Sequence, residues 1–191
     1  GYGVGGTDSS NNQPIYYYLA VGDNGNSWRS SDGITWTAVT SPTTGQLNGV
    51  VYGLNKFMTV GAGGFIAYTS DLSSSGTWTQ ATSGTSSSLN ALASNGAIVI
   101  TVGNNGTILR SGDGGSWVSA TSNTTQNLYG ISYSGSGVWN AVGAQGTLLS
   151  STDNGVTWKA IASNTTNDLR SAVAQTSTVT SNGSTTISYT V

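Results

Sequence analysis

The stretch Ser31-Asp32-Gly33-Ile34-Thr35-Trp36 decides the fold, because three variants of it follow along the chain. They run from Ser70-Asp71 to Gly76 and Trp78, from Asp113-Gly114-Gly115 to Trp117, and from Thr152-Asp153-Asn154-Gly155 to Trp158. The four tryptophans are 42, 39 and 41 residues apart. A fixed period of about forty residues is typical of a repeat protein in which each repeat forms one small structural unit.

Each repeat reads as four short strands separated by turns. The expected first strands are Leu47 to Tyr52, Leu89 to Ala93, Leu128 to Tyr133 and Leu169 to Ala174. A second strand ends in a glycine turn such as Gly61-Ala62-Gly63-Gly64, a third runs into the Asp turn, and a fourth carries the tryptophan. Short strands rich in β-branched and aromatic residues predict an all-β protein. Four antiparallel strands per repeat predict a β-propeller, of which four blades are visible.

The Asp turn has a structural explanation. An aspartate at this place accepts hydrogen bonds from nearby backbone N–H groups, glycine relieves the backbone, and the tryptophan covers the turn. Four equivalent aspartates spread around a ring cannot converge on one substrate. We therefore predict a structural role for Asp32, Trp36, Asp71, Trp78, Asp113, Trp117, Asp153 and Trp158.

These turns carry a family resemblance. The pattern Ser/Thr-x-Asp-x-Gly-x-Thr-Trp resembles the Asp-box, or BNR, repeat of sialidase-type propellers. With the preceding glycine turns, it resembles the photosystem II assembly-factor (Ycf48-like) propellers still more closely. Three boxes fit well, whereas Asp71 is followed by the Ser-rich insertion Leu72 to Ser75. The resemblance covers residues 16–174 and implies a fold, since Asp boxes occur in enzymes and in non-enzymes alike.

Two arrangements of the chain ends stay open. In one, the first blade starts at Ile15 with its second strand, and Leu169 to Ala174 supplies the missing inner strand and closes a four-bladed ring. In the other, Tyr2 to Val21 and Ser171 to Val191 are alike and each starts a blade, so the chain is part of a larger or intermolecularly completed propeller. We divide the chain into a Gly/Ser/Asn-rich segment (1–14), the blades (15–174), and a hairpin around Asn182-Gly183 or the start of a further blade (175–191).

The composition excludes several classes of function. The 191 residues include 5 Lys and Arg, 7 Asp, and no Glu, His or Cys. So few cations disfavour a nucleic-acid partner. Without His or Cys, there is no catalytic triad of the Ser-His-Asp or Cys-His kind, no His or Cys metal site and no disulfide. No apolar run is long enough to span a bilayer.

The Ser/Thr/Asn/Gly-rich surface favours an extracellular, cell-surface or virion location. The start Gly1-Tyr2-Gly3 has neither the basic nor the apolar part of a signal peptide, so we expect a mature product or an excised piece.

Polar loops at one end of the blades hold the candidate binding residues. Position two of each inner strand is a polar or aromatic residue placed near the channel mouth, and two acids lie in the nearby turns. The resulting tentative ligand-binding set is Asn48, Asn90, Tyr129, Arg170, Asp23 and Asp168. Amides, a phenol and a guanidinium suit a neutral or weakly acidic glycan, although the same groups also suit hydrogen bonds between blades. For Tyr16, Tyr17 and Tyr18 we weigh an aromatic platform against alternating burial along a strand, which is the more ordinary arrangement.

Catalysis is disfavoured. Two-carboxylate glycoside hydrolysis needs an opposed acid and base, and Asp23 with Asp168 is the sole candidate pair. The resemblance to sialidases does not extend to their site, because Arg29 and Arg110 lie on third strands and no glutamate is present.

We expect a non-enzymatic structural or adhesive propeller that assembles through its terminal strands with other protein chains, itself included, or binds a surface glycan. No cofactor or metal is expected. The alternatives are a glycan-binding or glycoside-hydrolase-like domain and an assembly factor for a partner protein.

Overall fold

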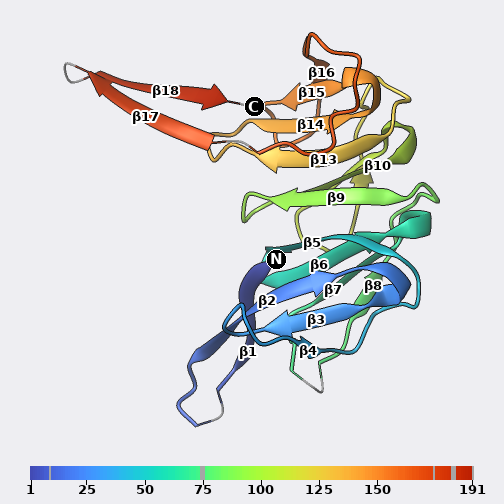
Figure 1. Cartoon of the computed structure of the whole chain (residues 1–191), viewed down its shortest axis with the longest axis vertical. Coiled ribbons are helices and arrows are strands. Elements are labelled where there is room, and N and C mark those ends of the chain that lie inside the picture. Colours follow the sequence, from blue (N-terminus) through green and yellow to red (C-terminus); the bar gives the residue numbers. More distant parts are fainter. Residues whose placement is uncertain (9, 74–75, 174, 182–183, 191) are drawn as a thin grey trace.

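The computed structural model consists of β-strands joined by short turns (Figure 1). It describes residues 1–8, 10–73, 76–173, 175–181 and 184–190, the last two segments as backbone alone. The first two sheets contain β1 (Tyr2–Thr7), β2 (Pro14–Val21), β3 (Ser27–Ser30), β4 (Thr37–Ala38), and β5 (Leu47–Gly53), β6 (Lys56–Gly61), β7 (Ile66–Thr69), β8 (Thr79–Ala81). The next two contain β9 (Leu89–Ser94), β10 (Val99–Gly103), β11 (Ile108–Ser111), β12 (Val118–Ser119), and β13 (Leu128–Tyr133), β14 (Trp139–Gly143), β15 (Leu148–Ser151), β16 (Lys159–Ala160). The predicted all-β fold is confirmed.

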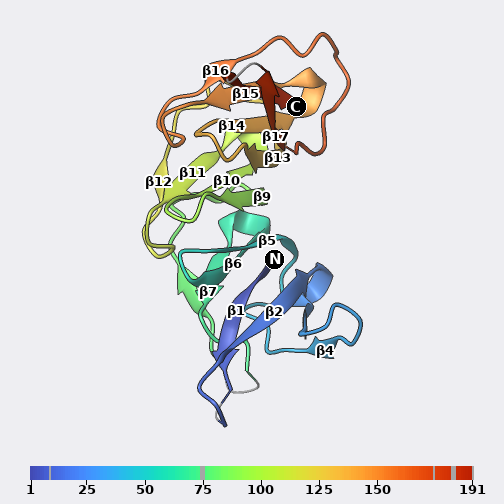
Figure 2. The ribbon, with the colours of Figure 1, turned by 90° about the vertical axis from the view of Figure 1, so that its left-hand side faces the viewer.

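Each four-stranded sheet is one blade, numbered one to four in chain order. All its strands pair antiparallel with their neighbours in sequence, from an inner strand to an outer one. The inner strands β1, β5, β9 and β13 contact one another in that order, so the blades are packed face to face. Figures 1 and 2 show them as a row with blade one and blade four at its two ends.

Glycine makes the turn between the second and third strand of each blade possible. These turns are the short helices η1 (Asp23–Gly25), η2 (Ala62–Gly64), η3 (Asn104–Gly106) and η4 (Ala144–Gly146). Gly106 has φ +66°, in the left-handed region that glycine tolerates. A Cβ at Gly106 would stand 1.9 Å from the carbonyl oxygen of Thr124 in the next loop. The turn and the loop therefore touch backbone to backbone.

The core lies between the blades. We call the contact of two consecutive blades a seam. At the seam of blades two and three, Val60 and Ile66 pack against Leu89 and Leu109, with Trp117 at the edge. The other seams have the same composition, and the box tryptophans Trp78 and Trp158 also pack there. Burial of these apolar faces is the main force that holds the blades together.

The structure decides between the two arrangements that we left open for the first blade, in favour of the one in which Tyr2 to Val21 starts a blade. β1 pairs with β2 and completes a four-stranded sheet, so blade one does not begin at Ile15 with its second strand. Residues 169–173 form no strand, and closure of the ring by the segment Leu169 to Ala174 is wrong; Ala174 itself lies outside the described residues. The segment nevertheless lies beside β13, because a Cβ at Gly130 would stand 3.0 Å from the Ser171 Cα.

After blade four, β17 (Gln175–Ser181) and β18 (Ser184–Thr190) pair with each other as an antiparallel hairpin. The expected turn residues Asn182 and Gly183 lie outside the described residues. The three-part division of the chain stays a prediction. Within the described part of the chain, no helix has the length and apolarity to cross a membrane.

Candidate functional site

Asp turns close the hairpins between the third and fourth strands. Asp32 Oδ1 accepts hydrogen bonds from the N–H groups of Ile34 at 2.8 Å and Thr35 at 2.7 Å. Asp113 Oδ1 accepts from the N–H groups two and three residues on, the latter from Ser116 at 2.7 Å. Asp153 accepts from both the N–H and the hydroxyl of Thr157. Each carboxylate is thus the acceptor that its turn needs.

These hydrogen bonds set the charge state of the carboxyl groups. The N–H of Ser116, followed by that of Gly115, lowers the pKa of Asp113 to about 2. The side chain and then the N–H of Thr157 lower the pKa of Asp153 to about 2. Hydrogen bonds from the turn likewise hold the pKa of Asp32 far below its ordinary value. Such groups are ionised at neutral pH and have no proton to donate as a general acid.

The second box departs from this pattern because of its insertion. The carboxylate of Asp71 accepts from the N–H and the hydroxyl of Ser73, at 2.7 and 2.8 Å. Leu72 turns inward and is 2% exposed at the first seam. The indole of Trp78 donates to the Thr40 carbonyl of blade one at 2.9 Å. Leu72, the first residue of the insertion, thus fills part of the seam between blades one and two.

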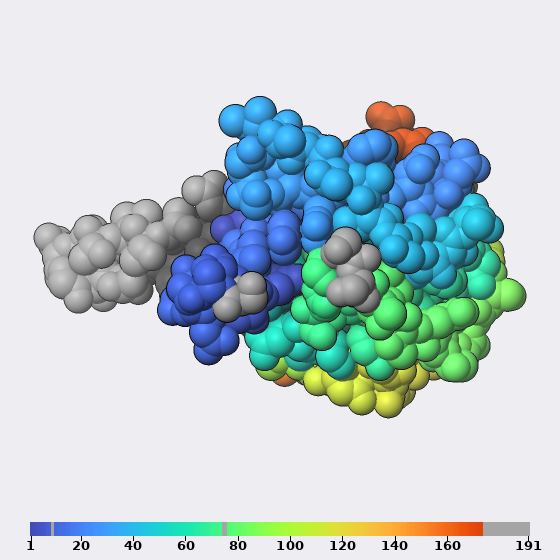
Figure 3. Space-filling view, turned by 90° about the horizontal axis from the view of Figure 1, so that it is seen from below, coloured from blue at the N-terminus to red at the C-terminus, as the bar shows by residue number. Residues whose placement is uncertain are grey.

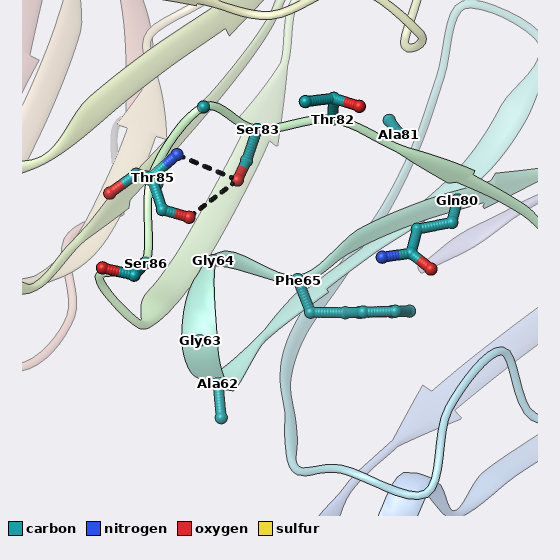
Figure 4. Close-up of a pocket in the computed structure, with 11 residues that line it drawn as sticks. Ala62, Gly63, Gly64, Phe65, Gln80, Ala81, Thr82, Ser83, Thr85 and Ser86 are labelled. Carbon is teal, nitrogen blue, oxygen red and sulfur yellow. Dashed lines mark hydrogen bonds between the residues drawn. The ribbon is translucent and has the colours of Figure 1, made fainter.

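The loops that lead from one blade to the next use their hydroxyl groups internally. Ser83 Oγ donates to the Thr85 carbonyl at 3.1 Å, and Thr85 Oγ1 accepts from the Ser87 N–H at 3.0 Å. Figure 4 shows the open hollow between this loop and η2, lined also by Phe65 and Gln80. Its lining contains no ionisable side chain. The hollow therefore offers hydrogen bonds and an aromatic ring, but no acid or base.

Two of the predicted binding residues join blades. Asn48 and Asn90 each stand at a β-bulge of an inner strand, a place where a side chain can be re-aimed. Asn48 Nδ2 donates to the Leu89 carbonyl of blade three at 2.8 Å. Asn90 Nδ2 donates to the Leu128 carbonyl of blade four at 2.8 Å and to Asn104 Oδ1 at 2.9 Å. Both amides thus donate hydrogen bonds across a seam, which agrees with the alternative interpretation that these groups bond between blades.

Three other predicted residues gather at the rim of blade four. The Arg170 guanidinium lies over the Tyr129 ring, 5.0 Å from its centroid, and makes an ion pair of 3.1 Å with Asp168. Asp168 Oδ1 also accepts the N–H of Gln145 in η4 at 3.2 Å. The Arg170 side chain is 73% exposed. We call Tyr129, Asp168 and Arg170 the rim cluster; it presents an aromatic ring, a cation and a carboxylate to solvent.

Asp23 does not join this cluster. It lies in η1 of blade one, whereas Asp168 bonds to η4 of blade four, and these two blades are the opposite ends of the row (Figure 1). The two acids that we considered as a glycosidase pair therefore do not face each other. Among the described residues, no three acidic or other metal-binding side chains come together to hold a metal ion.

A cluster of aromatic side chains on blade one includes residues that the sequence did not single out. Burial alternates along β2, so Tyr16 and Tyr18 are exposed while Tyr17 packs into the first seam. The ring of Tyr2 lies 5.8 Å from that of Tyr16 and 4.5 Å from that of Tyr18. Trp28 of β3 is exposed as well. The pairing of β1 with β2 brings Tyr2 to this place.

Comparisons with known proteins identify the fold. No protein-family model and no curated protein matches the sequence. The solved structure of YCF48 bound to D1 peptide matches with a TM-score of 0.63 and 20% identity, over 83% of this chain and 53% of that one. YCF48 from Cyanidioschyzon merolae gives 0.57 and 16% identity, over 80% of this chain and 55% of that one.

An ancestral GH74 enzyme also matches, with a TM-score of 0.61 and 18% identity, over 84% of this chain and 24% of that one. The chain thus spans about half the length of the YCF48 structures and about a quarter of the enzyme. These likenesses confirm the β-propeller fold class. At such identities they carry the fold alone.

Proposed function

We propose that the chain is a non-enzymatic structural or adhesive binding module, with Asp-box repeats, that joins other protein chains through the ends of its row of blades. The use of its acids carries the proposal. Asp32, Asp113 and Asp153 are ionised turn acceptors, and Asp168 holds Gln145 and Arg170. With no Glu or His in the sequence, no opposed acid and base are left.

The end blades supply the binding surfaces of this proposal. Blade one has an exposed aromatic face, and aromatic side chains are enriched in protein interfaces. Only 6% of the residues are charged, so two such surfaces meet with little electrostatic repulsion. We place the protein outside the cell, at a cell surface or in a virion, on the basis of its Ser/Thr/Asn/Gly-rich composition.

The test of the non-enzymatic part is direct. The purified chain is incubated with a panel of aryl glycosides, sialosides and β-glucan oligosaccharides, and release of product is followed. We expect none above the buffer rate. Release of product above the buffer rate would refute the proposal. Hydrolysis that persists in an Asp23→Asn, Asp168→Asn double variant would refute it equally, and would show that the two acids which we weighed for catalysis are not responsible.

The rim cluster favours a second candidate function, glycan binding. A half-buried aromatic ring beside an exposed guanidinium offers stacking to a sugar and a charge to an acidic one. A glycan array gives the ligand class, and calorimetry of Tyr129→Ala and Arg170→Ala then gives the contribution of the cluster. The matched control is Lys56→Ala, which removes the cation 4.4 Å above the Tyr68 ring on blade two. A blank array, or equal losses in all three variants, removes this candidate.

A third candidate, an assembly factor for a partner protein, rests on the likeness to YCF48, whose structure holds a D1 peptide. We expect a peptide partner of this chain to be neutral or apolar rather than strongly acidic, since the chain has only 5 Lys and Arg. A peptide array that selects acidic sequences would contradict this expectation.

A further inference from the structure

The outer face of blade one, the face turned away from blade two, carries a set of exposed aromatic side chains. The rings of Tyr2, Tyr16 and Tyr18 are 52%, 47% and 40% exposed. Trp28 and the box tryptophan Trp36 are 44% and 40% exposed. Figure 3 looks at this end of the row, where no other blade covers the blue surface of blade one. We call these five residues the aromatic face.

The same positions are buried in the other three blades. By strand register, Tyr18 opposite Ser30 corresponds to Phe57, Val99 and Trp139, all 0% exposed. Trp28 corresponds in the same way to Ala67, Leu109 and Leu149, which are 0%, 3% and 2% exposed. Among these equivalents, Phe57, Leu109, Trp139 and Leu149 pack at the seam with the preceding blade, against the face which that blade turns toward them. The fold itself therefore shows what kind of surface covers such a face. It is the face that a blade turns toward the next blade in the row.

Blade four offers that surface at the opposite end of the row. Ile161 is 48% exposed, whereas its equivalents Val39, Ala81 and Ala120 pack at the seams. Leu169 donates its N–H to the Gly143 carbonyl as Leu47 donates to Gly22, so it stands where the inner strand of a next blade starts. Leu169 is half-buried, while its equivalents Leu47, Leu89 and Leu128 are 3%, 0% and 0% exposed. An uncovered seam surface is thus present at this end as well.

The inner strands complement each other. In blade two, β5 pairs with β6 as far as Leu47 opposite Gly61. In blade one, β1 pairs only to Tyr18, with Gly1 and Leu19 exchanging hydrogen bonds beyond it. Among the described residues, no strand pairs with residues 20–22 in the way that β5 pairs with β6; the Gly22 carbonyl accepts only the N–H of Leu47 from blade two. Blade one thus lacks the part of an inner strand that would pair with residues 20–22. Residues 169–172 lie beside blade four at the equivalent positions of the repeat, and among the described residues no strand pairs with them as β6 pairs with β5.

We propose that the face of blade four turned away from blade three, in one copy, packs against the aromatic face of a second copy and so continues the row of blades. In this contact, residues 169–172 of the first copy pair with residues 20–22 of the second, and Ile161 lies against Trp28. The contact joins two different surfaces of the chain, so it closes into a ring or extends into a filament. This inference rests on the proposed function and names the second copy as the protein partner.

Engineered cysteines test the contact, since the chain has none of its own. At the internal seams, the residue before the box tryptophan forms a backbone bridge with the preceding blade, as in Thr121 with Thr157. The equivalent pair across the proposed contact is Ala162 of one copy and Thr35 of the next. We expect a mixture of Ala162→Cys and Thr35→Cys chains to form a disulfide-linked heterodimer on mild oxidation, and Trp28→Ser in the Thr35→Cys chain to lower its yield at least tenfold.

Two controls make the result decisive. The double variant Thr121→Cys, Thr157→Cys calibrates the reaction within one chain. A mixture of Val118→Cys with Thr35→Cys measures random collision, because Val118 is 61% exposed on the outer strand of blade three, away from both end faces. A yield from Ala162→Cys that equals the Val118→Cys yield, or that is unchanged by Trp28→Ser, overturns the inference. The non-enzymatic proposal would survive that result, whereas glycoside hydrolysis would refute the proposal and leave the cross-linking result unaffected.

Discussion

The box tryptophans offer a test of the seams, because the same residue of the repeat has two different environments. Trp158 is 2% exposed at the third seam and its indole donates to the Gly155 carbonyl at 3.1 Å. Trp36 holds the same place in blade one and is 40% exposed, since no other described blade packs against that face. We predict that Trp158→Ala destabilises the chain much more than Trp36→Ala does.

The magnitude follows from burial. Truncation of a buried Trp to Ala costs about 3–5 kcal/mol, which is our expectation for Trp158→Ala. A buried aromatic side chain removes about 200 Å² from water, at about 25 cal/mol per Å². The difference between 2% and 40% exposure is then about 80 Å², or about 2 kcal/mol. For Trp36→Ala we expect a loss of about 1–3 kcal/mol.

Urea unfolding followed by far-ultraviolet circular dichroism measures both losses without relying on tryptophan fluorescence. The experiment is done at low protein concentration, so that an association through blade one does not bury Trp36. Equal losses for the two variants, or a larger loss for Trp36→Ala, would refute the account of the seams.

Three further results are expected. Gly106→Ala should lower the free energy of unfolding by at least about 1–3 kcal/mol, through backbone strain and displacement of the facing loop. Gly22 has an extended backbone and open space around its Cβ position, so Gly22→Ala should change the unfolding midpoint little. Asn90→Ala should cost about 1–3 kcal/mol, because the Leu128 carbonyl loses its donor across the seam. The free energy of unfolding should be constant above about pH 4 and fall as the pH drops toward 2. The lowered pKa values of Asp113 and Asp153 give stabilisation that is lost when these carboxylates are protonated. An Asp113→Asn, Asp153→Asn variant with an unchanged acid transition would contradict this.

The repeat predicts the blades because each turn is local. Asp113 and Gly106 have roles that depend on residues a few positions away or in the adjacent loop, and the sequence pattern contains them. The first strand was expected in only one of the two arrangements of the chain ends, because Tyr-Gly-Val-Gly-Gly-Thr has little strand propensity and becomes a strand through its pairing with β2. Residues 169–173 have the opposite character: their pattern is that of a strand, but a strand exists only where a partner pairs with it.

The candidate site was likewise predictable only in part from the sequence. Asn48 and Asn90 were recognisable as polar residues at one position of the repeat, but their acceptors lie in the next blade and depend on the packing. Trp36 is indistinguishable in sequence from Trp158, although one faces solvent and the other a seam. Position in the row, rather than position in the repeat, decides which surfaces are free to bind.

Sedimentation velocity of the unmodified chain over a wide concentration range tests the central claim most directly. We predict a sedimentation coefficient that rises with concentration as copies join through blades four and one, and a constant monomer value for Trp28→Ser. A chain that sediments as a monomer at every concentration, with or without the substitution, would contradict assembly through the aromatic face.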